Sequence, residues 1–289
     1  MPPPASPAQR VLALLDGQRL TPAQRRIAQC LVEHAAQAAS LSSGELAELA
    51  RVSQPSVTRF ATALGFSGYP AMRRRLRELA GSAGAGPDGA GHDGGGPALN
   101  QLQRAVAAEA GHLHRLAETL ADPRPVTAAG ALLAGSRPLP VLGLRAAAPI
   151  AGYFGYFAAK VHPDVRVLDT GGSALADRLE QAHAAGASAL LAFVLPRYPR
   201  EALDALRTAR ALGLAPVVVT DSPVSPAADT AAVALTAGVG SRLVFDLHTG
   251  PMALATVLLQ AVCDADPDRA QERLESFERS VARRQVFAP

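Results

Sequence analysis

The sequence predicts an α/β protein with an all-helical N-terminal domain. Three observations support this: helix-type apolar spacing in the first 80 residues, a glycine-rich stretch after them, and short apolar runs alternating with helical stretches beyond it. Such alternation is typical of a doubly wound parallel sheet of about five strands with helices on both faces. We therefore expect a helical domain at residues 1–80, a flexible linker at residues 81–97 and an α/β domain at residues 98–289.

Charge is distributed unevenly along the chain. The first 80 residues contain ten arginines and five acidic residues, whereas the remainder carries a small negative charge. A basic segment of this kind suits a polyanionic partner.

Composition excludes several other classes of protein. No apolar run approaches the ~18 residues of a membrane span, and the N-terminus lacks the pattern of a signal peptide. The two cysteines, Cys30 and Cys263, lie in different predicted domains, and no metal-ligand spacing is present. We expect a cytoplasmic protein with no membrane association, no metal and no cofactor.

The N-terminal domain is predicted to contain five helices. Thr21 and Pro22 mark the start of the second helix, since a hydroxyl N-cap followed by proline is a common helix beginning. The expected ranges are residues 7–16, a helix beginning at Thr21, and residues 43–50, 53–65 and 70–80.

Residues 43–66, SGELAELARVSQPSVTRFATALGF, have the pattern of two short helices joined by a tight turn at residues 51–53. Ser53 can cap the second helix. The apolar positions spaced to pack the two helices across each other are Leu46, Leu49, Val52, Val57, Phe60 and Leu64.

The remaining positions of the second helix carry short or forked hydrogen-bonding side chains, which suits a recognition helix in DNA. These positions are Gln54, Ser56, Thr58, Arg59 and Thr62. Arg59 suits either a guanine edge or a phosphate. The alternative is an ordinary helical hairpin with a polar outer face.

The segment VSQPSVTRFATALGFSGYPAMRRRLREL, residues 52–79, resembles the RpiR-type transcription regulators. That family combines an N-terminal helix-turn-helix, a linker helix and a sugar isomerase (SIS) domain that senses phosphosugars, and the resemblance covers nearly the whole chain. It implies a homodimer or homotetramer on a two-fold-related operator of double-stranded DNA. It also implies that five side chains face DNA: Ser53, Gln54, Ser56, Thr58 and Arg59.

In the second domain the strands are expected at residues 139–144, 165–168, 189–195, 216–220 and 232–235. The helices are expected at residues 99–120, 147–161, 173–185, 199–212, 226–230, 245–264 and 268–284. In such a sheet, ligands bind at the carboxyl ends of the strands, at the topological switch point.

The loops after the first and third strands depart from the resemblance, which implies glycine- and hydroxyl-rich loops around a sugar phosphate. Here the loops are GLRAAAP and VLPRYPRE, which keep Gly143 and supply Arg145, Arg197 and Tyr198. Ser222 belongs to a further loop that keeps the family's appearance. We expect these five residues to form the effector site.

Arginine forks bind carboxylate or phosphate bidentately, so we expect a small anionic effector. A sugar phosphate, a sugar acid and an organic acid all fit. Surface or interface salt bridges remain the alternative role for Arg145 and Arg197, and simple packing remains the alternative for Tyr198.

No catalytic constellation stands out. His162, His183 and His248 are scattered, Asp246 makes a weak acid/base pair with His248, and residues 238–241 fit a small anion-binding turn. We therefore predict a ligand-responsive transcription regulator and not an enzyme. The alternatives are an SIS-type sugar-phosphate isomerase with an accessory helical domain, and a ligand-free dimerisation domain on a DNA-binding head.

Overall fold

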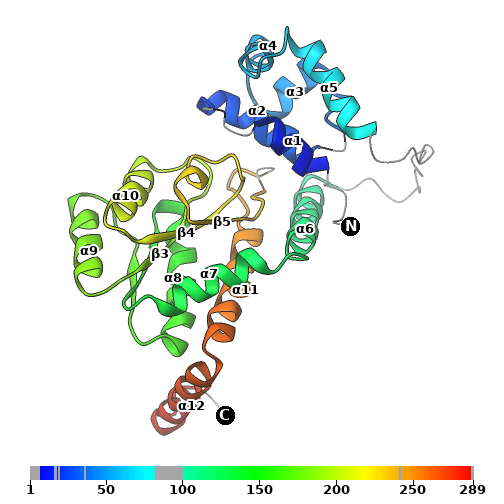
Figure 1. Cartoon of the computed structure of the whole chain (residues 1–289). Coiled ribbons are helices and arrows are strands. Elements are labelled where there is room, and N and C mark those ends of the chain that lie inside the picture. Colours follow the sequence, from blue (N-terminus) through cyan, green and yellow to red (C-terminus); the bar gives the residue numbers. More distant parts are fainter. Residues whose placement is uncertain are drawn as a thin grey trace. The chain divides into compact units, whose positions relative to one another are not determined.

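The structure is a computed structural model that describes residues 7–15, 18, 20–35, 37–81, 100–240 and 243–287. The chain divides into two compact units, residues 1–96 and 97–289, and each is described by itself (Figure 1). The predicted linker lies outside the described residues, apart from Gly81 at the end of a helix. Its flexibility and its boundaries therefore stay predictions.

The N-terminal unit is built from five helices around one small core. The second helix begins with a capping box, in which the Thr21 hydroxyl accepts from the Gln24 amide and the Gln24 side chain accepts from the Thr21 amide. Ile27, Phe60 and Met72, from three different helices, are almost completely buried. The helices are α1 (Pro7–Leu15), α2 (Pro22–Glu33), α3 (Ser43–Leu49), α4 (Gln54–Ala63) and α5 (Tyr69–Gly81).

One core expectation in this unit is wrong. Leu49 was expected inside and is 49% exposed. An α-helix advances by about 100° per residue, so Leu46, Ala47 and Ala50 cluster on the buried side of α3 while Leu49 falls beside that cluster.

The C-terminal unit contains a five-stranded, all-parallel sheet in the order β2-β1-β3-β4-β5, which confirms the predicted fold class. The strands are β1 (Leu139–Gly143), β2 (Val165–Leu168), β3 (Ala189–Phe193), β4 (Ala215–Thr220) and β5 (Val233–Thr236). The α-helices are α6 (Gln101–Thr119), α7 (Arg124–Gly135), α8 (Ala148–Val161), α9 (Ser173–Ala184), α10 (Arg200–Ala211), α11 (Thr249–Ala265) and α12 (Pro267–Arg284). Two 3₁₀ turns are η1 (Arg145–Ala147) and η2 (Ala228–Thr230).

Helices cover both faces of the sheet (Figure 1). Phe154 of α8 and Leu258 of α11 pack with residues of α7 on one face, whereas Leu179 of α9 and Leu206 of α10 pack on the other. Every residue of β1 and β3 is buried, as expected for central strands of a doubly wound sheet.

Three elements differ from the expectation. Helix α7 was not predicted; its Gly130 fits against α11, because a Cβ there would lie 2.5 Å from the Ala261 carbonyl oxygen. The helix expected at residues 226–230 is only the turn η2. Helix α11 begins at Thr249, not at residue 245, because Gly240 and Leu247 exchange two backbone hydrogen bonds that close the preceding loop.

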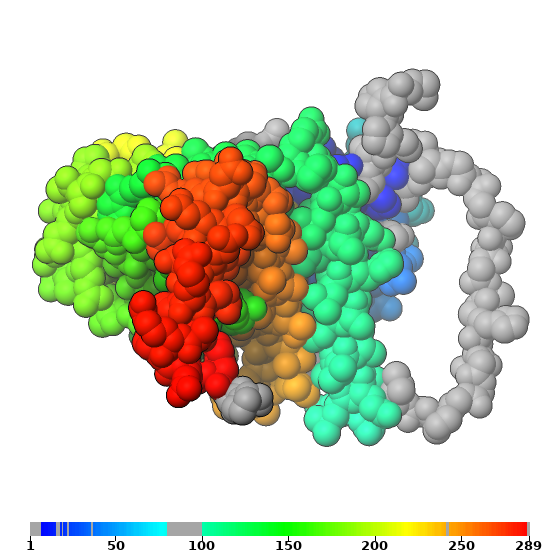
Figure 2. All heavy atoms as spheres, turned by 90° about the horizontal axis from the view of Figure 1, so that it is seen from below, coloured from blue at the N-terminus to red at the C-terminus, as the bar shows by residue number. Residues whose placement is uncertain are grey.

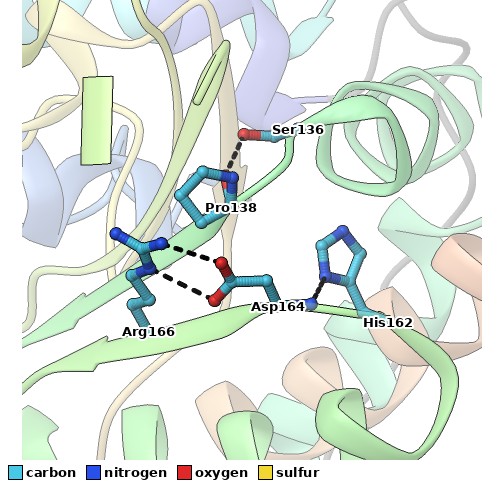
Figure 3. Close-up of polar contacts among 5 residues, drawn as sticks. All are labelled: Ser136, Pro138, His162, Asp164 and Arg166. Carbon is cyan, nitrogen blue, oxygen red and sulfur yellow. Dashed lines mark hydrogen bonds and ion pairs between the residues drawn. The ribbon is translucent and has the colours of Figure 1, made fainter. Parts of the chain in front are cut away.

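Polar groups fasten the amino end of the sheet, where β1 to β3 begin (Figure 3). The buried Ser136 hydroxyl donates to the Pro138 carbonyl and accepts from the Ser188 and Ala189 amides, at 2.8–3.1 Å. Nearby, His162 Nδ1 accepts from the Asp164 amide at 3.3 Å. Burial lowers the pKa of His162, which disfavours the protonated imidazole in the folded protein.

Candidate DNA-binding surface and effector site

Helices α3 and α4 form a helix-turn-helix. The two helices pack on each other, and Leu46 of α3 and Val57 and Phe60 of α4 are completely buried. The turn between them passes through Arg51, whose φ of 50° lies in the left-handed region. The Val52 amide then donates to the Ala47 carbonyl at 2.9 Å, which closes the turn.

The outer face of α4 carries a row of linked polar side chains. Ser53 occupies the N-cap, but its hydroxyl does not cap the helix; it lies 2.9 Å from the Ser56 hydroxyl instead. The Arg59 guanidinium donates to the same Ser56 oxygen at 3.1 Å. We call this row the Ser53–Ser56–Arg59 ladder. It runs along one side of the helix because its members are three residues apart.

Two further predicted residues share this exposed surface. Gln54 donates from Nε2 to the Ser43 hydroxyl at 2.9 Å, which ties the start of α4 to α3. Thr58 is exposed on the next turn. The structure thus brings all five predicted DNA-facing residues to one helix, four of them exposed and Ser56 half-buried.

Helix α5, which follows α4 in the sequence, carries several positively charged side chains. Arg74, Arg75 and Arg77 are exposed, and Arg75 pairs with Glu78 at 3.0 Å. A surface ion pair of this kind contributes little to the free energy of unfolding. The Arg75 guanidinium can therefore leave the Glu78 carboxylate and bind a phosphate with little loss of free energy.

In the C-terminal unit the topological switch point lies between β1 and β3. These strands pair with each other, while the chain leaves β1 toward β2 and leaves β3 toward β4. The crossovers α8 and α10 cover opposite faces, so the two loops diverge and leave room at the carboxyl end of the sheet.

Gly143 and Arg145 form the loop after β1. A Cβ on Gly143 would lie 2.6 Å from the Ala147 carbonyl oxygen and from the Ala151 Cβ, so only glycine permits this turn. Arg145 follows with φ of 55° and is exposed. The sequence signal for the close turn is the glycine itself.

Arg197 repeats the same feature in the loop after β3. Its φ is 68° and it is exposed. Left-handed backbone costs a non-glycine residue of order 1 kcal/mol, and such strain clusters at functional sites. Neither Arg145 nor Arg197 makes a side-chain hydrogen bond or ion pair with another described residue, so the alternative of an intramolecular salt bridge finds no support there.

Tyr198 and Ser222 are already engaged by the protein. The Tyr198 hydroxyl donates to the Asp221 carboxylate, at 2.9 and 3.1 Å from its two oxygens. The buried Ser222 hydroxyl accepts from the Val224 amide at 3.4 Å. Sequence reasoning missed Asp221, a buried carboxylate that ties the loop after β3 to the loop after β4; its position directly after a buried strand was the available signal.

A hollow with a volume of about 270 Å³ lies between α9 and α10. Its lining includes Ser173, Thr208 and the carboxylates of Glu201 and Asp204. Two carboxylates disfavour an anion, so this hollow does not suit the predicted effector.

His183 and His248, the other histidines considered for catalysis, lie at the end of α9 and at the start of α11. The described residues contain no group of three or more His, Cys, Asp or Glu side chains placed to hold a metal ion. Among the same residues, no helix combines the length and the apolar character needed to cross a membrane.

These features define the class of the protein: a helix-turn-helix unit followed by a doubly wound parallel α/β unit. Residues 15–82 match the helix-turn-helix domain of the rpiR family. The chain therefore has the architecture of the RpiR-type regulators, a helix-turn-helix followed by an SIS domain, as the sequence predicted.

One named relative is a transcriptional regulator. The chain is 32% identical over 143 residues to the HTH-type transcriptional regulator HexR of Pseudomonas aeruginosa, which is 50% of this chain and 49% of that relative. The match thus spans only about half the length of either protein.

Two solved structures share the fold. The sugar isomerase domain of an RpiR transcription factor from Sphaerobacter thermophilus is 25% identical, covers 60% of this chain and 97% of its own, and has a TM-score of 0.52. The Vibrio vulnificus NanR protein complexed with ManNAc-6P is 14% identical, covers 98% of this chain and 100% of its own, and has a TM-score of 0.55. At that identity the second likeness concerns the fold alone.

Proposed function

We propose that this chain is a DNA-binding transcriptional regulator whose operator affinity is controlled by a small anionic metabolite bound at the β1–β3 switch point. The observation that carries the proposal is the rpiR-family helix-turn-helix with its polar, exposed α4. In this proposal it acts in the cytoplasm as a homodimer or homotetramer on an operator with two-fold-related half-sites.

The Ser53–Ser56–Arg59 ladder, Gln54 and Thr58 form the proposed DNA-contacting surface. The ladder holds the Arg59 guanidinium before DNA arrives, which lowers the conformational entropy lost on binding. Arg59 then reads a guanine or clamps a phosphate, while the short hydroxyls contact the backbone.

The proposed effector site lies around Gly143, Arg145 and Arg197, with Tyr198 and Ser222 shaping its walls. Two exposed guanidiniums with no side-chain partner among the described residues favour a carboxylate or phosphate. The hydroxyls at the end of β4 already bind the protein, so charge-assisted arginine contacts supply the attraction. Sugar phosphates, as in the NanR complex, are one candidate class, beside sugar acids and organic acids.

The test has two arms. Selection from a random duplex library should yield a two-fold-related operator, and Arg59→Ala should weaken binding to it by about 1–3 kcal/mol if Arg59 reads a base. Operator binding that is unchanged by both Arg59→Ala and Gln54→Ala would rule out α4 as the recognition helix.

The second arm is a thermal-shift screen with sugar phosphates, sugar acids and organic acids. A true effector at about 100 times its dissociation constant adds roughly 2.7 kcal/mol to the free energy of unfolding. A flat response would favour a ligand-free dimerisation domain. Interconversion of aldose and ketose phosphates by the same preparation would favour the isomerase alternative.

A further inference from the structure

Glu109 and His112 of α6 form a buried pair that the proposed function does not use. Glu109 is only 5% exposed, and its Oε1 lies 3.0 Å from His112 Nδ1. Its other oxygen, Oε2, is buried and has no hydrogen-bond partner among the described residues. Burying a half-satisfied carboxylate costs free energy, which favours a role other than stability for this pair.

The pair lies against the loop that follows β5. A Cβ on Gly240 would lie 2.0 Å from Glu109 Oε1, and a Cβ on Gly238 would lie 3.1 Å from the His112 ring. A Cβ on a third glycine, Gly250 in the first turn of α11, would lie 2.6 Å from the Gly238 carbonyl oxygen. Because these positions are glycine, α6, the loop and α11 can pack closely against one another.

The figures show the same neighbourhood. Helices α6 and α11 lie side by side in Figure 1 and again in Figure 2, and they pack directly on each other. The loop is closed by the backbone bonds between Gly240 and Leu247, at 3.1 and 2.8 Å. It continues from the carboxyl end of β5, the end of the sheet at which Arg145 and Arg197 also lie.

Helix α6 is the first described helix after the helix-turn-helix unit. We infer that Glu109 and His112 form the joint through which the carboxyl end of the sheet controls α6, and through α6 the DNA-binding unit. The inference rests on the proposed function. Its physical basis is that a packed, interlocked contact transmits a shift of the loop to α6, whereas an exposed side-chain pair would not.

The same helix supplies a matched control. His114 and Glu118 form a second histidine–glutamate pair on α6, at 3.5 Å, but their side chains are 79% and 66% exposed. Changes in this exposed pair should leave the joint intact.

The first test is hydrogen exchange on the full chain. Glu109→Gln keeps the shape of the side chain and should speed exchange of the Gly240 and Leu247 amides by about tenfold, because their mutual bonds then open more often. Gly240→Ala should do the same to the α6 amides around Glu109. Glu118→Gln should match the wild type. Wild-type exchange rates in Glu109→Gln would overturn the inference, since that conservative variant is expected to fold.

The second test uses the selected operator duplex and needs no known effector. Coupling is reciprocal, so operator binding should change loop exchange in the wild type by about threefold or more. Glu109→Gln should bind the same duplex within about twofold of wild type and lose that change. A wild-type loop that does not respond to DNA would overturn the inference. If no duplex binds, the proposed function is wrong, and the exchange comparison still decides whether the pair couples α6 to the loop.

Discussion

The two ends of the parallel sheet differ in how many contacts their polar side chains make with the rest of the protein. At the amino end, the Ser136 hydroxyl serves four backbone groups and the Arg166 guanidinium pairs with Asp164 at 2.8 Å. At the carboxyl end, Arg145 and Arg197 lie in left-handed backbone, and neither side chain has a hydrogen-bond or ion-pair partner among the described residues. The Ser136 and Arg166 contacts stabilise the fold, whereas Arg145 and Arg197 combine backbone strain with exposed charge, as expected of residues that serve a function.

The amino end should show the largest effect on stability. Ser136→Ala removes the acceptor of the buried Ala189 amide and of the partly buried Ser188 amide. A buried amide left without a partner costs about 1–3 kcal/mol, so we expect the free energy of unfolding in urea to fall by about that amount. Ser173→Ala, at an exposed position on α9, is the control and should change it by less than about 0.5 kcal/mol. A small loss in Ser136→Ala would remove the contrast between the two ends.

The carboxyl end should show the largest effect on binding. Arg197→Ala should weaken the best anion of the thermal screen about tenfold to a hundredfold, because a charge-assisted hydrogen bond contributes ~1.5–3 kcal/mol. Arg197→Lys should restore only part of this, since an ammonium lacks the planar fork. Calorimetric titration measures all three proteins, and equal affinities would place the anion elsewhere.

At the amino end of the sheet, protonation of His162 should make the free energy of unfolding depend on pH. Burial lowers its pKa in the folded protein below the ordinary 6.5. As the pH drops through 6.5, His162 binds a proton more readily in the unfolded chain than in the folded chain. The free energy of unfolding is therefore unaffected above about pH 7 and falls as the pH drops through 6.5. The fall ends below the folded pKa. His162→Gln should flatten this segment of a stability–pH curve, and an unchanged slope would contradict the assignment.

Substitutions that relieve backbone strain should have the smallest effect on the free energy of unfolding. Arg145→Gly and Arg197→Gly should each raise the free energy of unfolding by about 0.5–1 kcal/mol, because glycine adopts left-handed backbone without strain. Arg178→Gly, in the middle of α9, should lower it by a similar amount. A loss of stability in the first two variants would mean that these arginines also support the fold.

The sequence predicts the regular parts of this molecule well. All five strands lie within two residues of their expected ends, because buried parallel strands are continuous apolar runs bounded by turns. The helix-turn-helix was equally visible, since its polar positions remain once Leu46, Val57 and Phe60 are placed in the core.

The parts that were missed depend on tertiary contacts. Helix α7 is rich in alanine and glycine and shows its role only where Gly130 meets α11. The left-handed backbone of Arg145 and Arg197 has no sequence signal, because such residues are normally glycine or asparagine. The Tyr198–Asp221 bond joins loops that are 23 residues apart in sequence, and Glu109 becomes buried only where α6 meets the loop after β5.

The central claim is that an anion at the carboxyl end of the sheet controls DNA binding by the N-terminal unit. Its most direct test is to titrate the operator complex with the best anion of the thermal screen and to measure operator binding by fluorescence anisotropy. In the wild type the anion should shift operator affinity by about 5–150-fold, the usual range of allosteric coupling. The Arg145→Ala/Arg197→Ala variant should bind operator normally without the anion and fail to respond to it. A double variant that responds with the wild-type midpoint would contradict the account.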